Sequence, residues 1–323
     1  MTNLPNSLQF KIMVKKITVF GAGAVGSTLA YNLLTRLKFD ELVLIDINDG
    51  LANGVRCDLE DTRGFLNFST KITAGKEALL MQDSDIIAFT AGVARKEGMT
   101  RMDLLKINGK IAKDTAGEIK KYAPNSIVVA VTNPLDVITY IFAHTLGFAR
   151  NRVIGMGSSL DTSRMLNLLF NETQVVPSSL EGYVFGAHSE DMIVSLDRVR
   201  VKGEDLDCFV DSIDEEAMAK RVKLRGAEIV GFLKNRSAYF APALSAACLI
   251  EAIASNKNEI IPVAVFLDGE YGAKDICMGV PCVINRNGVD KIIEIKLRDK
   301  EKKEIKKIEK VFKELKPFIH GEK

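Results

Sequence analysis

The sequence predicts an α/β fold in which a doubly wound parallel sheet is followed by a second domain of mixed α+β structure. Apolar runs alternate with helical patterns from residue 16 to residue 155, which is typical of a parallel sheet covered by helices on both faces. After residue 157 this alternation stops. The length of 323 residues also exceeds the roughly 250–300 residues at which one core stops growing. We therefore expect two domains, 13–154 and 155–323.

Composition narrows the classes of partner. The 44 Lys and Arg residues nearly balance the 42 Asp and Glu residues, for a net charge of +2, so nucleic acid is not expected as a partner. Five cysteines without CxxC spacing and only three histidines argue against a disulfide framework or a zinc site. The longest charge-free apolar span, Ser237 to Ile250, is shorter than the ~20 residues that cross a membrane. We expect a cytoplasmic protein with a small-molecule partner and no membrane partner.

The stretch 16–46, KITVFGAGAVGSTLAYNLLTRLKFDELVLID, reads as strand, glycine turn, helix and strand. Such a GxGxxG turn binds a pyrophosphate, because its glycines allow a tight bend and a close backbone approach at a helix N-terminus. The candidate turn residues are Gly21, Ala22, Gly23, Ala24, Val25 and Gly26. Asp46 follows Gly26 by 20 positions and ends the second strand, where a carboxylate binds a ribose hydroxyl and disfavours NADP. A purely structural turn is the alternative, but this context favours a Rossmann domain that binds NAD.

The next elements continue the alternation. We expect strands near 71–73, at 85–91, at 126–131 and at 152–155, because each is a short apolar run. Helical patterns cover 51–59, 103–122 and 134–144. Continuous apolar runs such as DIIAFTA are typical of parallel strands that are buried on both faces.

The segment 92–103, GVARKEGMTRMD, lies just beyond the carboxyl end of the strand at 85–91. Ligands bind at that edge of a doubly wound sheet, so the basic residues Arg95, Lys96 and Arg101 make this segment a candidate lid. A solvated basic loop is the alternative interpretation.

The second half combines helices and antiparallel strands. A helix starting near residue 157 carries Asp161 and Arg164 three positions apart, so a local ion pair is one interpretation of them. Strands at 180–185 and 191–196 flank GAHSED, which places His188 at a turn, where a lone histidine is usually structural.

Farther along, 215–253 is helical with a break at 237–242, and 260–267 and 275–284 form an antiparallel segment. The charged C-terminal segment has Ile305, Ile308, Phe312 and Leu315 at helical spacing. We expect an amphipathic surface helix there; a basic nucleic-acid arm is the alternative, but the interleaved glutamates argue against it.

The motifs occur in the order GAGAVG, LVLID, TAGVARKEGMTRMDLL, VTNPLDV, GMGSSLDTSR, GAHSEDM and GEYGAKDICMGVP. In this order they resemble the lactate/malate dehydrogenase superfamily, and most closely the lactate-dehydrogenase-like malate dehydrogenases. The resemblance covers nearly the whole chain from residue 13. It implies an NAD-binding Rossmann domain, a catalytic domain, a lid over the active site, and a homodimer or homotetramer.

The resemblance also implies the roles of individual residues. His188 is the expected proton acceptor and donor, because a histidine titrates near neutral pH, and Asp161 orients its imidazole. Arg164 is expected to bind the C1 carboxylate of the substrate, and Arg101 to polarise the reacting oxygen when the lid closes. Further contacts are expected from Asn133, which binds the substrate and cofactor, and from Asn108 and Val131, which seat the nicotinamide half of the cofactor.

The substrate prediction rests on Arg95. At this lid position lactate dehydrogenases typically have glutamine and malate dehydrogenases arginine, because the C4 carboxylate of oxaloacetate needs a cationic partner. The resemblance therefore implies reversible oxidation of (S)-malate to oxaloacetate with NAD, the malate dehydrogenase step of the tricarboxylic acid cycle.

One position departs from the family pattern. The family usually has glycine after the catalytic histidine, whereas this chain has Ser189. If that glycine takes a positive φ, serine there is strained or tilts the histidine. This departure leaves open a catalytically weak NAD-binding protein. Within the enzyme class, a broader 2-hydroxy-acid dehydrogenase of the lactate type is a further alternative.

Overall fold

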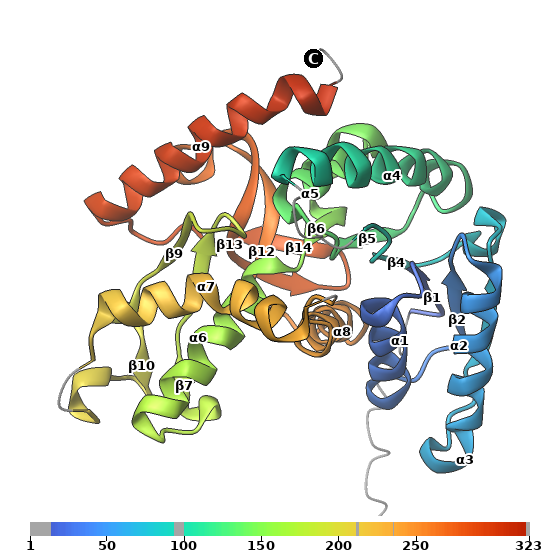
Figure 1. The fold of residues 1–323 in the computed structure, drawn as a ribbon, viewed down its shortest axis with the longest axis horizontal. Coiled ribbons are helices and arrows are strands. Elements are labelled where there is room, and N and C mark those ends of the chain that lie inside the picture. Colours follow the sequence, from blue (N-terminus) through green and yellow to red (C-terminus); the bar gives the residue numbers. More distant parts are fainter. Residues whose placement is uncertain (1–13, 94–99, 211–212, 235, 321–323) are drawn as a thin grey trace, which may run out of the picture.

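The computed structural model describes residues 14–93, 100–210, 213–234 and 236–320. Its helices, shown in Figure 1, are α1 Ala24–Arg36, α2 Asp49–Asp61, α3 Arg63–Leu66, α4 Arg101–Tyr122, α5 Leu135–Leu146, α6 Gly157–Thr173, α7 Glu215–Leu233, α8 Phe240–Ala254 and α9 Asp299–His320. Its strands are β1 Lys16–Phe20, β2 Glu41–Ile45, β3 Lys71–Gly75, β4 Ile86–Phe89, β5 Ile127–Ala130, β6 Val153–Gly155, β7 Leu180–Glu181, β8 Val184–Gly186, β9 Met192–Val194, β10 Arg200–Val201, β11 Glu204–Asp205, β12 Glu259–Asp268, β13 Lys274–Asn285 and β14 Gly288–Ile292.

The first half of the chain forms the expected doubly wound sheet. Strands β3, β2, β1, β4, β5 and β6 lie in that order, and each neighbouring pair is parallel. Strands β4 and β5 are buried at every position, as expected for strands covered on both faces. Figure 1 shows α4 and α5 on one side of these strands and α1 and α8 on the other.

Helix α1 connects the two halves of the molecule. It buries Leu29, Ala30, Leu33 and Leu34, and packs closely against α8. Helix α8 presents buried alanines such as Ala243, Ala246 and Ala247, whose small side chains allow the two helices to approach each other. The second half of the chain is therefore fixed directly to the helix that follows the glycine turn.

The sheet continues across the expected domain boundary. Strand β12 pairs antiparallel with β6 through Ala264 and Gly155, and β12 forms a long antiparallel pair with β13. Strands β8 and β9 complete that end of the sheet, and β14 pairs with the last residues of β13. A separate small sheet, β11–β10–β7, covers a second hydrophobic cluster that includes Met165, Leu169 and Val222.

The helical stretch predicted at 215–253 is confirmed as two helices, α7 and α8, separated at the expected break. The strand predicted at 180–185 is instead two short strands in different sheets. Leu180 pairs with β10, whereas Gly186 pairs with β13. The sequence pattern could not show this division, because burial alone does not identify the pairing partner of a strand.

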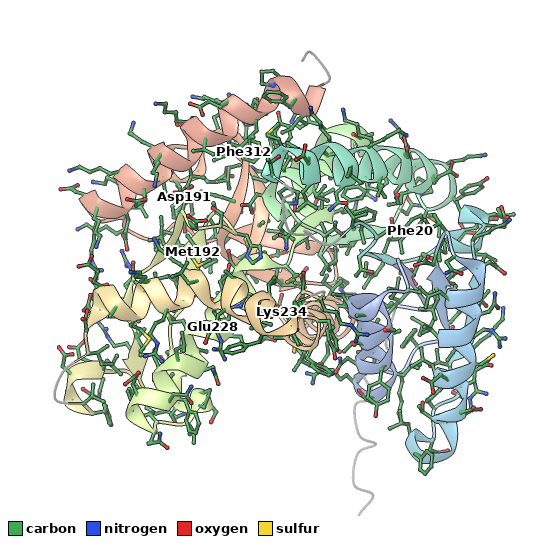
Figure 2. All side chains as sticks on the ribbon, in the orientation of Figure 1. Phe20, Asp191, Met192, Glu228, Lys234 and Phe312 are labelled. Carbon is green, nitrogen blue, oxygen red and sulfur yellow. The ribbon has the colours of Figure 1, made fainter. Side chains whose placement is uncertain are left out.

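Helix α9 is the amphipathic surface helix that the sequence predicts. Its apolar residues Ile305, Ile308 and Phe312 are buried, and Phe312, labelled in Figure 2, packs edge-on against Tyr140 of α5 with ring centroids 5.0 Å apart. At its start, the buried Glu301 accepts hydrogen bonds from Arg198 (2.7 and 2.8 Å) and from Ser195 (2.8 Å). Burial by itself raises the pKa of Glu301. These hydrogen bonds and one from the backbone nitrogen of Arg298 outweigh burial, so the pKa falls to about 2. In the part of the chain that the structure describes, no helix is long and apolar enough to cross a membrane.

Candidate functional site

The candidate residues lie around the carboxyl edge of the parallel sheet. The chain leaves β1 towards β2 and β3 and then returns to β4, on the other side of β1. Such a reversal is the topological switch point, where ligands bind in open α/β sheets. The glycine turn follows β1 directly, Asp46 follows β2, and the segment from Val131 to Pro134 follows β5.

The glycine turn is shaped by close backbone approaches. Gly21 has φ +108°, and a Cβ there would lie 2.6 Å from the nitrogen of Ala91, so only glycine fits without a shift. A Cβ on Gly26 would lie 1.8 Å from the carbonyl oxygen of Gly21. Gly23, by contrast, is exposed, and a Cβ there would meet nothing within 4 Å. The turn therefore presents open backbone at the N-terminus of α1, as a phosphate site requires.

Asp46 is held against this turn. Its Oδ2 accepts a hydrogen bond from the backbone nitrogen of Ala22 (2.8 Å), and its Oδ1 accepts one from that of Asn48 (2.9 Å). A carboxylate has about four acceptor positions, so both oxygens can still accept from a ligand hydroxyl. The acidic residue predicted from its spacing thus lies beside the glycine turn.

Asn108 links Val93, at the start of the candidate lid segment 92–103, to the segment after β5. It is fully buried; its Oδ1 accepts from the backbone nitrogen of Val93 (2.8 Å), and its Nδ2 donates to the carbonyl oxygen of Asn133 (2.7 Å). Asn133 itself is exposed, and Val131 is buried at the end of β5. Asn108 therefore positions two neighbouring loops, and its direct contact with a cofactor stays a prediction.

His188 and Asp161 come together from different elements. His188 lies in the turn between β8 and β9, and its Nδ1 is 2.6 Å from Oδ2 of Asp161 in α6. The side chain of Asp161 is only 1% exposed and that of His188 11% exposed. With Nδ1 donating to the carboxylate, Nε2 is the ring nitrogen that can take up or release a proton. This pairing favours a role for His188 in proton transfer over the structural role that is usual for a lone histidine.

Arg164 shares the same carboxylate. Its Nη1 lies 3.1 Å from Oδ1 of Asp161, so the local ion pair predicted from their spacing is present. Burial lowers the pKa of the His188 imidazole, and the charge of Arg164 lowers it too. The charge and hydrogen bond of Asp161 and the charge of Asp136 raise this pKa more strongly, so the net pKa lies above the ordinary histidine value.

The lid arginines are only partly placed. Arg95 lies outside the described residues, as does Lys96. Arg101 is the first residue of α4, immediately after Thr100, whose Oγ1 accepts from the backbone nitrogen of Asp103 (3.1 Å). This capping box fixes where the helix begins, and with it the backbone position of Arg101.

Ser189 does not have the strained backbone that the departure from the family pattern suggested. It is not among the described residues with positive φ. Its nitrogen donates to the oxygen of Ala187 (2.8 Å), and its oxygen accepts from Met192 (3.1 Å). The expectation of strain at this position is wrong, because the turn accommodates a serine in an ordinary conformation.

Two residues near His188 were missed by the sequence reasoning. Asp136 accepts a hydrogen bond from the backbone nitrogen of His188 (2.8 Å). Gly157 lies against the imidazole, because a Cβ there would be 2.8 Å from Cγ of His188. Both residues fall inside motifs recognised in the sequence, VTNPLDV and GMGSSLDTSR, but no local signal connects them to a turn farther along the chain.

This arrangement supports a defined chemistry. An imidazole held by a buried carboxylate can exchange a proton with a hydroxyl group, and a nearby guanidinium can bind a carboxylate. The site lies on the same sheet as a turn suited to a dinucleotide. Across the described ranges, no group of three His, Cys, Asp or Glu side chains is arranged to hold a metal ion.

Comparisons with known proteins cover almost the whole chain. The family model described as lactate/malate dehydrogenase, NAD binding domain, matches residues 15–155, and that described as lactate/malate dehydrogenase, alpha/beta C-terminal domain, matches 158–320. The chain is 38% identical over 290 residues to malate dehydrogenase 1 of Anaeromyxobacter dehalogenans, which covers 89% of this chain and 93% of that protein. It is 40% identical over 299 residues to the malate dehydrogenase of Pelagibacter ubique, and the match covers 90% of this chain and 92% of that protein.

Solved structures agree with these relatives. The malate dehydrogenase of Cryptosporidium parvum superimposes with a TM-score of 0.91 at 33% identity, covering 96% of this chain and all of that one. The lactate dehydrogenase of the same organism, solved with lactic acid and nicotinamide adenine dinucleotide, gives a TM-score of 0.90 at 29% identity. This match covers 96% of this chain and 99% of that one.

Proposed function

Because this chain belongs to the lactate/malate dehydrogenase family, we propose that it is an NAD-dependent malate dehydrogenase that interconverts (S)-malate and oxaloacetate. The matching family models confirm the family inferred from the motifs, and the structural match confirms the fold. The observation that carries the proposed reaction is the pair formed by His188 and the buried Asp161, with Arg164 on the same carboxylate.

The cofactor fits the residues around β1. The open backbone at Gly23 and Ala24 would hold the pyrophosphate, and Asp46 would accept from a ribose hydroxyl while its charge disfavours a 2′-phosphate. Asn133 and Val131, which lie beyond the end of β5, are the proposed contacts to the nicotinamide half. When bound, NAD supplies the hydride acceptor.

His188 carries the proton in this proposal. In malate oxidation its neutral Nε2 accepts the proton of the substrate hydroxyl, and in oxaloacetate reduction the protonated ring returns it. Asp161 keeps the proton of Nδ1 in place and stabilises the imidazolium that forms. The imidazole lies close to Gly157, and Asp136 holds the backbone of His188.

Charged side chains select the substrate. Arg164 has five N–H donors, so its contact with Asp161 leaves others for the C1 carboxylate. Arg101 would polarise the reacting oxygen once the lid closes, and Asn133 would donate to it. Arg95 would bind the C4 carboxylate, which distinguishes oxaloacetate from pyruvate.

We assign cofactor binding to 13–154 and the catalytic domain to 155–323. Strand β6 spans the boundary and supports a rigid junction, because Val153 and Ile154 pair with β5 and Gly155 pairs with Ala264 of β12. Both halves contribute to one site: Asp46 and Asn133 come from the first, and His188 and Arg164 from the second. We also propose a cytoplasmic location and a role in the tricarboxylic acid cycle, which is where malate oxidation regenerates oxaloacetate.

Assembly into a homodimer or homotetramer is supported by large apolar side chains that are exposed on α7 and α8. Phe232 near the end of α7 is 79% exposed, and Phe240 at the start of α8 is 68% exposed. Leu233 and Leu244 beside them are also more than two-fifths exposed. A soluble monomer rarely leaves such a group of large apolar residues in water, so burial against a second copy is favoured.

Following the loss of NADH absorbance on mixing with oxaloacetate tests the reaction. Turnover with oxaloacetate that far exceeds that with pyruvate is expected, and it should be abolished in a His188→Asn variant. Comparable turnover with pyruvate and longer oxoacids would instead favour a broad 2-hydroxy-acid dehydrogenase. Binding of NADH without turnover would favour a catalytically weak NAD-binding protein.

A further inference from the structure

Asp136 contacts His188 of the candidate site through the backbone. It is in the first turn of α5, and its Oδ2 accepts a hydrogen bond from the backbone nitrogen of His188 (2.8 Å). Its Oδ1 is buried and has no hydrogen-bond partner among the described residues, the only side-chain atom of that part of the chain in this state. Burying an unpartnered carboxylate oxygen is costly, so this residue requires an explanation.

The hydrogen bond to the His188 nitrogen does not by itself explain why residue 136 carries a carboxylate. A neutral asparagine at position 136 offers the same carbonyl acceptor to the His188 nitrogen and avoids the cost of a buried charge. What only the carboxylate supplies is a second negative charge beside the imidazole, in addition to that of Asp161. Removing it would leave the backbone contact but change the electrostatics of the ring.

Among the described residues, the titratable groups that face Asp136 belong to this site or to the sheet beneath it. His188 faces it from the β8–β9 turn, Asp161 from α6 and Cys277 from β13, while Arg164 acts on the imidazole. Burial raises the pKa of Asp136 to about 7, although the charge and backbone hydrogen bond of His188 lower it and the charge of Asp161 raises it. The ionisation of Asp136 is therefore coupled to that of the His188 imidazole.

We propose that Asp136 is a positioning residue for His188: its carboxylate fixes the backbone of His188 and, in addition to the carboxylate of Asp161, places a second negative charge beside the imidazole. This inference rests on the proposed role of His188 in proton transfer. It assigns to α5 a function in the reaction that differs from the contacts of Asn133, three residues earlier in the same motif.

The sign of the effect follows from the charge. The negative charge of Asp136 favours imidazolium, so removing it lowers the pKa of His188. Oxaloacetate reduction needs protonated His188 and declines above that pKa. Malate oxidation needs neutral His188 and declines below it. The pH range over which each activity declines is called its limb. Loss of the Asp136 charge should therefore move the limbs of both reactions to lower pH.

The test compares the pH profiles of kcat/KM for both directions in the wild-type protein and in Asp136→Asn. Both limbs are expected to move to lower pH in this variant. The matched control is Asp191→Asn, which removes a carboxylate three residues from His188 that is engaged with Lys307 of α9 (2.7 Å). The profile of this control should coincide with that of the wild type. Limbs that stay in place in Asp136→Asn, whatever happens to kcat, would overturn the proposal.

A second measurement needs no variant at position 136. The chain has only three histidines, so the NMR signal of the His188 ring in the wild-type protein can be assigned with a His188→Asn variant. Its titration is expected to show two steps, because Asp136 ionises in the same range of pH. A single step at the ordinary histidine pKa would refute the coupling. Since this titration needs no turnover, it distinguishes failure of the Asp136 proposal from failure of the proposed malate dehydrogenase reaction.

Discussion

Replacing Asp161 by asparagine tests the centre of the proposed mechanism. The substitution keeps the size of the side chain but removes the charge that lies 2.6 Å from Nδ1 of His188. An asparagine can also present its NH₂ group to Nδ1, which would favour the wrong tautomer of the ring. We expect NADH binding to be unchanged, because the glycine turn and Asp46 lie on other elements.

The size of the effect follows from the geometry. Two unit charges 2.6 Å apart attract each other by about 6 kcal/mol at an effective dielectric constant of about 20. A charge-assisted hydrogen bond is roughly twice as strong as a neutral one, so the amide retains about half of this stabilisation. Losing the other ~3 kcal/mol from the state in which His188 carries the proton lowers kcat by about a hundredfold.

The assay measures kcat and kcat/KM for oxaloacetate reduction between about pH 6 and 9, with NADH affinity and thermal unfolding as controls. Because the charge of Asp161 raises the pKa of His188, the alkaline limb should also move to lower pH. A folded variant whose kcat falls less than about threefold and whose limb does not move would refute the role of Asp161.

Three further changes test other parts of the molecule. Arg95→Gln should raise the ratio of kcat/KM for pyruvate to that for oxaloacetate by a factor of at least about 10³, since the C4 carboxylate loses its partner; an unchanged ratio contradicts the assignment. Gly157→Ala should lower kcat about tenfold or more with NADH binding intact, because its Cβ would lie 2.3 Å from Cδ2 of Leu135 and 2.8 Å from Cγ of His188; full activity would show that both side chains adjust freely. Glu301→Gln should lower the free energy of unfolding by about 2 kcal/mol at pH 7. That difference, measured by denaturant unfolding, should be complete above the ordinary glutamate pKa of 4.5 and vanish as pH falls towards 2, because pairing with Arg198 lowers the folded-state pKa. No pH dependence of the difference would refute the pairing.

Local patterns were enough to predict the parallel sheet and the glycine turn. Strands β4 and β5 are short apolar runs, and the turn is encoded by glycines that lie within six residues of one another. Such features depend on neighbours along the chain, so sequence periodicity reveals them. The candidate residues Asp161, Arg164 and His188 could be named for the same reason: each lies in a short motif of a recognisable family.

Only the tertiary structure decided how these motifs meet. Asp136 is 52 residues from His188 along the chain, and the hydrogen bond between them exists because the start of α5 and the β8–β9 turn are brought together on one sheet. The same packing places Gly157 against the imidazole and gives Ser189 an unstrained turn. The sequence by itself therefore determined the fold class and named the candidate residues of the cofactor turn and of the proposed reaction. Distances, burial and coupled charges depend on contacts between distant segments, so the three-dimensional packing was needed to define them.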